Sequence, residues 1–245
     1  MQRLAIDFQQ LQPPYLQLTS DQRHYLQRVL RLKSGAQFLA LPGDGMAWRC
    51  ELVDENARVI EAQVVMTELP IAVTLALALP KTGFEEVVRQ VTELGVGTIV
   101  PLLSERTILN PSVNKWSRWQ RIAAEASEQS ERALVPSVRE PIAFHKFLQE
   151  QEAVRGFLCW GRGDSPHLMA ALTHYKSQDS IAPDSIAPDS ITIAIGPEGG
   201  WSESEVDRAI AAGFETVSLG KRILRAVTAP IVVMAIVGGV WEEQG

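Results

Sequence analysis

The chain has 245 residues, of which 46% are hydrophobic, so it can form one large or two small domains with genuine cores. Acidic residues outnumber basic ones, 29 to 23, and the net charge of −6 gives no support for a broad nucleic-acid-binding surface. Cys50 and Cys159 lack metal-type spacing, which argues against a disulfide framework or a zinc site, and no metal is expected. The N-terminus carries no basic-then-apolar signal peptide, which predicts a cytoplasmic protein.

Residues 1–70 are predicted to form a small β-barrel with one helix. The helix is expected over residues 20–32, where Ser20 and Asp21 begin it and apolar residues recur at helical spacing. Pro-Gly-Asp-Gly at 42–45 is typical of a hairpin turn between apolar runs. The runs expected to be strands are 36–41, 46–53 and 59–65, and Pro70 marks the predicted domain boundary.

From residue 71 onward the pattern changes to alternating strands and helices. Near-continuous apolar strands between helices indicate an α/β fold with a parallel sheet covered on both faces. The strands are expected at 72–79, 98–102, 156–160, 191–195 and 216–219, and the helices at 84–94, 115–134, 166–175, 203–212 and 227–241. The apolar stretch 226–241 has 16 residues, short of the ~20 that span a bilayer, which predicts a buried helix and no membrane partner.

Residues 178–191 contain a short tandem repeat of Asp-Ser-Ile-Ala-Pro. Proline and aspartate in a tandem duplication are typical of an exposed loop, so this segment is predicted to be a mobile repeat loop without a chemical role.

Two glycine-bearing turns near the C-terminus carry the strongest functional signal. The strand 191–195 runs into Gly-Pro-Glu-Gly-Gly at 196–200, followed by a helix start in which Ser202 and Glu205 form a capping box. The strand 216–219 ends at Gly220 and a second loop. Two successive strand-to-loop transitions predict a ligand site at the carboxyl edge of the sheet, although neither loop fits a known phosphate motif and a plain tight turn remains an alternative.

These residues also resemble a known family. Gly-Pro-Glu-Gly-Gly at 196–200, followed by Leu-Gly-Lys-Arg-Ile-Leu-Arg at 219–225, is similar to the C-terminal signature of the SPOUT methyltransferases. Within that class the chain most resembles the 16S ribosomal RNA (uracil-N3) methyltransferase family. Four further segments agree with that family in the same order, namely 24–33, 92–96, 104–107 and 119–132.

The resemblance implies a fold and an activity. It implies a PUA-like, RNA-binding β-barrel domain at 1–70 and a SPOUT-like methyltransferase domain with a trefoil knot at 71–245. It also implies a homodimer that uses S-adenosylmethionine to methylate N3 of a uridine in 16S ribosomal RNA or the small ribosomal subunit. Two alternatives stay open. One is a SPOUT enzyme that methylates ribose 2′-oxygens of transfer or ribosomal RNA, and the other is a non-catalytic RNA-binding assembly factor.

Methylation of uracil N3 requires loss of the N3 proton, because the neutral imide nitrogen has no available lone pair. Such an enzyme needs alignment and stabilisation of negative charge more than a covalent nucleophile. Arg222 and Arg225 in the loop after the second strand, and Arg106 after the strand at 98–102, are the predicted catalytic cations. Glu198 is a candidate proton acceptor, and its alternative role is to cap the next helix.

The binding residues predicted by the same reasoning fall into two sets. Backbone amides and apolar walls for the cofactor are expected from Gly196, Pro197, Glu198, Gly199, Gly200, Leu219, Gly220, Ile223, Leu224, Ala226 and Thr228. For Leu219 and Leu224 ordinary core packing is an equal alternative. RNA contacts are expected from Arg23, Arg28, Arg31, Lys33, Arg106, Gln129 and Arg132, where a solvated helix face is the alternative.

One departure from the family pattern concerns residues 224–229, where the family has Leu-Arg-Thr-Glu-Thr-Ala. Val227 stands in place of the glutamate, and Gln90 stands in place of a common lysine. Joint loss of two opposite charges favours a structural pair between the family's glutamate and lysine. The alternative is that this protein uses different proton chemistry.

Overall fold

A computed structural model describes residues 1–43, 45–64, 67–108, 111–150, 155–161, 164–179 and 190–242. The chain divides into two compact units. Unit 1 comprises Met1–Glu68 and Ala124–Val135, and unit 2 comprises Leu69–Ala123 and Pro136–Gly245. The chain first passes from unit 1 to unit 2 between Glu68 and Leu69, close to the predicted boundary at Pro70. A single boundary there does not describe the division, because residues 124–135 belong to unit 1.

Unit 1 is built on a six-stranded sheet in the order β1-β4-β5-β6-β3-β2, of which only the β1–β4 pair is parallel. The predicted apolar runs correspond to β4, β5 and β6, and side chains such as Leu16, Phe38 and Leu52 fill the core. The sequence pattern missed three strands of two to four residues, which are too short to show alternation. The strands are β1 Gln2–Ala5, β2 Leu11–Gln12, β3 Tyr15–Leu16, β4 Gln37–Leu41, β5 Met46–Val53 and β6 Asn56–Val64.

The predicted helix of unit 1 is shorter than expected. Helix α1, Ser20–His24, begins at Thr19, which forms a capping box with Gln22, and the π-helix η2, Tyr25–Val29, continues it. Arg31 adopts a positive φ of 56°, so the helix ends before Leu32. A 3-10 helix, η1 Phe8–Gln10, precedes β2. The hairpin turn predicted at 42–45 joins antiparallel strands β4 and β5, although Asp44 lies outside the described residues.

Unit 2 contains a seven-stranded, all-parallel sheet in the order β10-β8-β7-β12-β11-β13, with β9 paired to β8. The five predicted strands are present, and β13 begins two residues earlier than expected. The two-residue strands β9 and β10 were missed. The strands are β7 Ala72–Ala78, β8 Thr98–Leu103, β9 Ser137–Val138, β10 Ile142–Ala143, β11 Arg155–Cys159, β12 Ser190–Ile195 and β13 Phe214–Val217.

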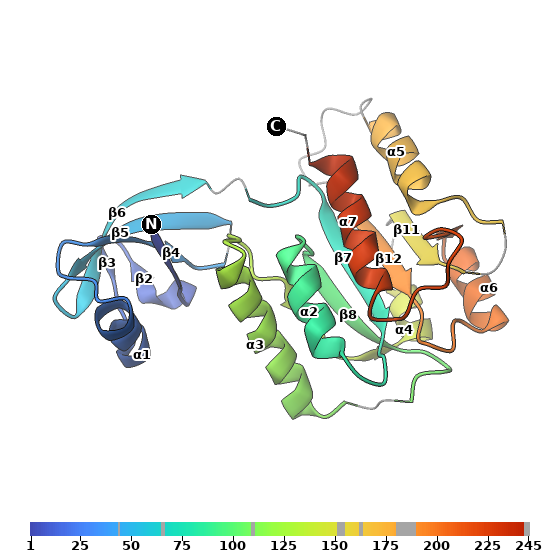
Figure 1. The fold of residues 1–245 in the computed structure, drawn as a ribbon, viewed down its shortest axis with the longest axis horizontal. Coiled ribbons are helices and arrows are strands. Elements are labelled where there is room, and N and C mark those ends of the chain that lie inside the picture. The colour runs from blue at the N-terminus through green and yellow to red at the C-terminus, as the bar shows by residue number, and fades with distance from the viewer. Residues whose placement is uncertain are drawn as a thin grey trace. The chain divides into compact units, whose positions relative to one another are not determined.

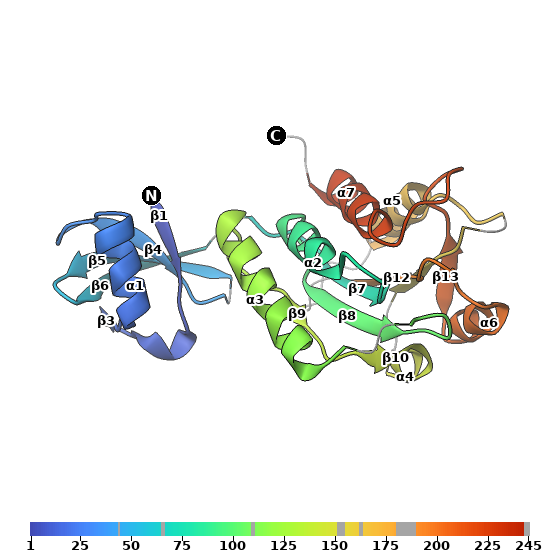
Figure 2. The same cartoon turned by 60° about the horizontal axis from the view of Figure 1, so that its bottom comes forward.

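Helices cover both faces of this sheet, as the apolar strands predict (Figure 1). Figure 2 shows α2, α5 and α7 on one side of the sheet and α4 and α6 on the other. Two separate buried clusters line the two faces. Helix α4 was missed, and α3 ends five residues before the predicted Leu134. The helices are α2 Phe84–Glu93, α3 Val113–Gln129, α4 Phe144–Gln149, α5 Leu168–Asp179, α6 Glu203–Ala211 and α7 Ala229–Trp241.

Some predictions concern features beyond these elements. Most of the repeat at 178–191, from 180 to 189, lies outside the described residues. Within the described ranges no helix combines the length and apolar character that crossing a bilayer requires. The trefoil knot stays a prediction. The sheet order places β12 between β7 and β11, so the loops that follow these three strands share one edge of the sheet.

Candidate functional site

A cavity of about 190 Å³ lies at this carboxyl edge of the sheet. Its lining comes from the end of β11 (159–161), the loop after β12 (195–201) and the segment after β13 (219–229). Ile223 is 78% exposed, and its Cδ1 lies 3.0 Å from the position that a Cβ on Gly161 would occupy. The structure therefore brings the two glycine-bearing loops together around one cavity, with Ile223 beside Gly161, just after the end of β11.

The lining contains every predicted cofactor residue except Thr228. Gly196 to Gly200 contribute from one loop, and Leu219, Gly220, Ile223, Leu224 and Ala226 contribute from the other. Thr228 instead stands at the N-cap of α7, and its backbone N–H donates to the Arg225 carbonyl at 2.9 Å. Arg222, predicted as a catalytic residue, also lines the cavity. Six further lining residues were missed, three of them, at the end of β11, because strand order cannot be read from the sequence. They are Cys159, Trp160, Gly161, Ile195, Trp201 and Ala229.

Trp201 forms a rigid side of the cavity. Its indole is 4% exposed, stacks on Phe144 with ring centroids 4.4 Å apart, and donates from Nε1 to the Cys159 carbonyl at 3.2 Å. A Cβ on Gly196 would lie 3.1 Å from this indole. Glycine at 196 therefore allows the backbone of the loop to pass close to a side chain that cannot move away.

Glu198 connects the loop after β12 to the loop after β7. Its Oε1 accepts the backbone N–H of Lys81 at 3.0 Å, and its side chain is exposed. Glu198 does not cap the next helix, because Ser202 and Glu205 do so through a reciprocal capping box. The contact brings Lys81, which sequence reasoning missed, beside the glycine-bearing loop.

The predicted catalytic arginines occupy different places. Arg222 lines the cavity. Arg225 is exposed and outside the lining, and its carbonyl accepts the N–H groups of Thr228 and Ala229 at the start of α7. Arg106 donates from Nη1 to the carbonyls of Gly199 at 2.6 Å and Trp201 at 3.4 Å. Arg106 therefore supports the backbone of the loop, and Arg222 is the arginine best placed to meet a ligand.

The predicted RNA contacts in unit 1 are mostly exposed. Arg28, Arg31, Lys33 and Gln129 have exposed side chains, and Arg23 forms an ion pair of 3.6 Å with Glu55. These positions are compatible with contacts to RNA phosphates and equally with a solvated surface.

Arg132 is the exception, because its side chain is only 3% exposed. Its Nε and Nη2 donate to Glu68 Oε2 at 3.0 and 2.6 Å. The other oxygen of Glu68 accepts the N–H groups of Ala133 and Leu134 at 3.0 and 3.1 Å. A buried guanidinium that is held in this way is not available to RNA, so the prediction for Arg132 is replaced by a structural role within unit 1.

Val227, which stands where the family has a glutamate, lies beside the start of α2. Val227 Cγ1 lies 3.1 Å from the position of a Cβ on Gly83, the N-cap residue of that helix. Gln90 is seven residues farther along α2, which at ~1.5 Å per residue is roughly 10 Å along the helix axis. A direct pair between side chains at 90 and 227 would have to span that distance.

Cys159 is among the residues that line the cavity, and its side chain packs against the buried cluster on one face of the sheet. Burial raises the pKa of this thiol to about 12. The reactive thiolate is therefore scarce at pH 8. We expect N-ethylmaleimide at pH 8 to leave Cys159 unmodified in the native protein and to modify it after denaturation, as measured by peptide mass spectrometry. Rapid labelling of the native protein would contradict this burial.

Among the described residues no cluster of three or more histidine, cysteine, aspartate or glutamate side chains could hold a metal ion.

Comparison with known proteins agrees with this architecture. A family profile described as RNA methyltransferase domain matches residues 67–238, and one described as RNA methyltransferase PUA domain matches residues 18–65. Ribosomal RNA small subunit methyltransferase E of Synechocystis sp. is 47% identical over 98% of this chain and 78% of that protein. The protein of the same name from Bacillus subtilis is 30% identical over 97% of this chain and 96% of its own length.

A solved structure shares the fold. Ribosomal RNA small subunit methyltransferase E from Neisseria gonorrhoeae, solved with S-adenosylmethionine bound, has 27% identity and a TM-score of 0.79 over 98% of both chains. The parallel-sheet α/β domain and the N-terminal PUA-like domain expected from the sequence are thereby confirmed. The chain belongs to the ribosomal RNA small subunit methyltransferase E family, in which an RNA methyltransferase domain follows a PUA domain.

Proposed function

We propose that this protein transfers a methyl group from S-adenosylmethionine to N3 of one uridine in the 16S RNA of the small ribosomal subunit. The observation that carries the proposal is the cavity enclosed by the two glycine-bearing loops. Family membership supports it, as does the S-adenosylmethionine bound to the Neisseria gonorrhoeae relative.

The chemistry of the lining fits this cofactor. Leu219 and Leu224 provide apolar walls for an adenine ring, and loop amides provide hydrogen-bonding groups. At Gly196 the loop backbone passes close to Trp201 and carries no side chain. When bound, S-adenosylmethionine supplies an electrophilic methyl group at its sulfonium. The protein then has to align the uracil and remove its N3 proton.

Proton removal leaves negative charge on the uracil, which a cation at the cavity stabilises. Arg222 lines the cavity, and we assign this role to it, with Arg225, three residues later in the sequence, contacting RNA or uracil from outside the lining. Glu198 is the acidic residue among the lining residues, and we assign proton acceptance to it. Arg106 supports the loop in this scheme.

The other proposals concern assembly and RNA binding. We assign the RNA-binding role of residues 1–70 to Arg23, Arg28, Arg31 and Lys33, with Gln129 adding a contact from the segment that returns to unit 1. Residues 71–245 form the methyltransferase domain in this scheme. A trefoil knot, a homodimer and a cytoplasmic location complete the proposal.

The direct experiment incubates the purified protein and S-adenosylmethionine with small ribosomal subunits, or with naked 16S RNA, from cells that lack the gene. Nucleoside mass spectrometry is expected to detect N3-methyluridine at one position. A 2′-O-methylated nucleoside would show the alternative SPOUT activity. RNA binding without methyl transfer at saturating S-adenosylmethionine would show an assembly factor, and either result contradicts the proposal.

A further inference from the structure

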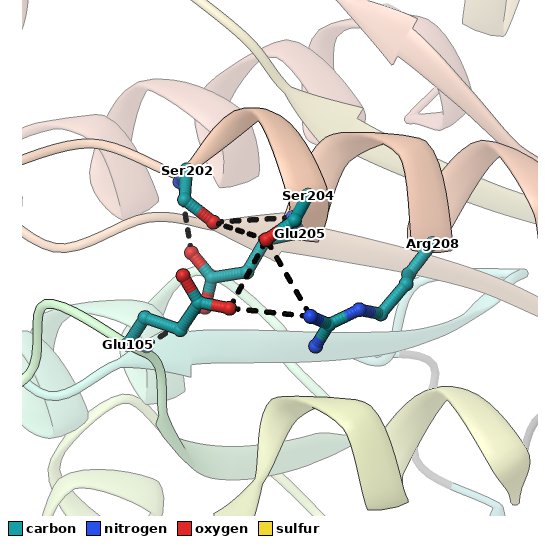
Figure 3. A network of polar contacts seen from close by, with 5 residues as sticks. All are labelled: Glu105, Ser202, Ser204, Glu205 and Arg208. Carbon is teal, nitrogen blue, oxygen red and sulfur yellow. Dashed lines mark hydrogen bonds and ion pairs between the residues drawn. The ribbon is translucent and has the colours of Figure 1, made fainter.

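The buried carboxylate of Glu205 joins two segments that are 100 residues apart in sequence (Figure 3). Glu205 is only 2% exposed. Its Oε2 accepts the N–H of Ser202 at 2.9 Å, and Ser202 Oγ in turn accepts the N–H of Glu205 at 3.2 Å, which completes the capping box of α6. Its second oxygen, Oε1, accepts the backbone N–H of Glu105 at 2.8 Å. The helix cap therefore uses one oxygen, and the other reaches the segment after β8.

That segment is a compact turn formed by residues 104–107. The N–H of Thr107 donates to the Ser104 carbonyl at 3.0 Å, and the N–H of Ser104 donates to Thr107 Oγ1 at 3.1 Å. Glu105 is the second residue of this turn. Because the turn is closed by its own hydrogen bonds, fixing the N–H of Glu105 fixes the turn as a unit.

The turn carries the arginine that supports the glycine-bearing loop. From it, Arg106 reaches the carbonyls of Gly199 and Trp201, both of which belong to the cavity lining. The Glu205 bond and the Arg106 bonds thus connect the same turn to the start of α6 and to the loop that precedes it. Loss of the hydrogen bond between Glu205 and the Glu105 amide therefore frees the turn from which Arg106 binds the loop carbonyls.

The peripheral contacts of the turn are weaker. Glu105 Oε1 accepts Ser204 Oγ at 3.1 Å and Arg208 Nη2 at 3.4 Å, and both partners are exposed. Hydrogen bonds from Ser202 and Ser204 lower the pKa of the Glu105 carboxyl. Exposed ion pairs contribute little, whereas a buried carboxylate that loses a donor is costly. The bond from the Glu105 amide to the buried carboxylate of Glu205 is therefore the strongest of these contacts to the turn.

We infer that Glu205 is a positioning residue for the methyl-donor site: it fixes the 104–107 turn, through which Arg106 holds the loop carbonyls and hence the cofactor-facing loop. This inference rests on the proposed binding of S-adenosylmethionine at that loop. It assigns to Glu205 an effect on cofactor affinity, although its side chain is not part of the cavity lining.

The first test replaces Glu205 by glutamine and measures the Kd for S-adenosylhomocysteine by calorimetry. Glutamine keeps one acceptor oxygen but presents an NH₂ group to an N–H donor, so one of the two bonds is lost. We expect affinity to fall about tenfold, the scale of one lost hydrogen bond to a charged group. Glu203→Gln is the matched control, because Glu203 is exposed on the same turn of α6, and it is expected to bind as the wild type does.

The second test removes the hydrogen-bond donor, the N–H of Glu105, and leaves the acceptor Glu205 unchanged. Glu105→Pro deletes the N–H that Glu205 accepts, and proline is favoured at the second position of such a turn. Glu105→Ala keeps that N–H and removes the peripheral side-chain contacts. We expect Glu105→Pro to reproduce the loss seen with Glu205→Gln, and the difference between the proline and alanine variants to isolate the backbone bond.

Kinetics distinguish positioning from a general loss of stability. With variants shown to be folded by circular dichroism, we expect the KM for S-adenosylmethionine to rise about tenfold, in line with the lost affinity, while the KM for the RNA substrate stays unchanged. Wild-type affinity in both Glu205→Gln and Glu105→Pro, or equal rises in both KM values, would overturn the inference. Absence of binding by the wild type would instead refute the proposed function.

Discussion

Replacing Gly196 by alanine is expected to weaken S-adenosylmethionine binding at least tenfold and to lower the free energy of unfolding by about 1–3 kcal/mol, the usual cost of overpacking. The added Cβ would lie 3.1 Å from the Trp201 indole. That indole is confined by Phe144 on its face and by the hydrogen bond to the Cys159 carbonyl. The loop must therefore shift, and because its residues line the cavity, the shift changes the ligand site.

Calorimetry with S-adenosylhomocysteine and chemical denaturation measure the two effects. Gly239→Ala is the matched control, because this helical glycine has open space around its Cβ position, and alanine there is expected to stabilise α7 by up to ~1 kcal/mol. Gly196→Ala with wild-type affinity would show that the loop backbone does not shape the ligand site.

Replacing Glu68 by alanine is expected to destabilise unit 1 by about 3–5 kcal/mol, the range seen when one member of a buried ion pair is removed. The Arg132 side chain is 3% exposed and would lose its counterion. The N–H groups of Ala133 and Leu134 would lose their acceptor at the same time. The loss of an acceptor for these two backbone N–H groups adds to the loss of Coulomb energy.

Hydrogen exchange of unit 1 peptides in increasing denaturant measures this loss. Arg58→Ala is the control within unit 1, because Arg58 and Glu51 form an ion pair with side chains 57% and 27% exposed, which is worth less than ~1 kcal/mol. A loss of the same small size for Glu68→Ala would mean that the buried pair is not a major support of unit 1. It would also reopen an RNA role for Arg132.

The architecture was largely predictable because its strands are buried on both faces. Runs such as those of β7 and β12 are mostly apolar, and some helices have clear boundaries, for example the capping box of Ser202 and Glu205 at the start of α6. Two-residue strands and the six-residue helix α4 carry no periodicity that could reveal them. The return of residues 124–135 to unit 1 depends on contacts over long sequence separations, such as that of Arg132 with Glu68.

The site was predictable where it depends on local sequence. Glycines after two strands that are consecutive in the sequence, β12 and β13, marked both loops of the cavity. The contribution of β11, through Cys159 to Gly161, depends on strand order, which local pattern does not specify. Arg106 was recognised as a cation at the right edge, but its bonding to loop carbonyls in place of a ligand follows from the three-dimensional position of the 104–107 turn. The residue types in the sequence predicted the location of the site, whereas packing between distant segments determines the role of Arg106.

A crystal structure of this protein with S-adenosylhomocysteine tests the central claim most directly. The account predicts ligand density between residues 196–201 and 219–226, with Ile223 moved from its position against Gly161. Density at another place, or none at saturating ligand, would contradict the assignment of this cavity as the methyl-donor site.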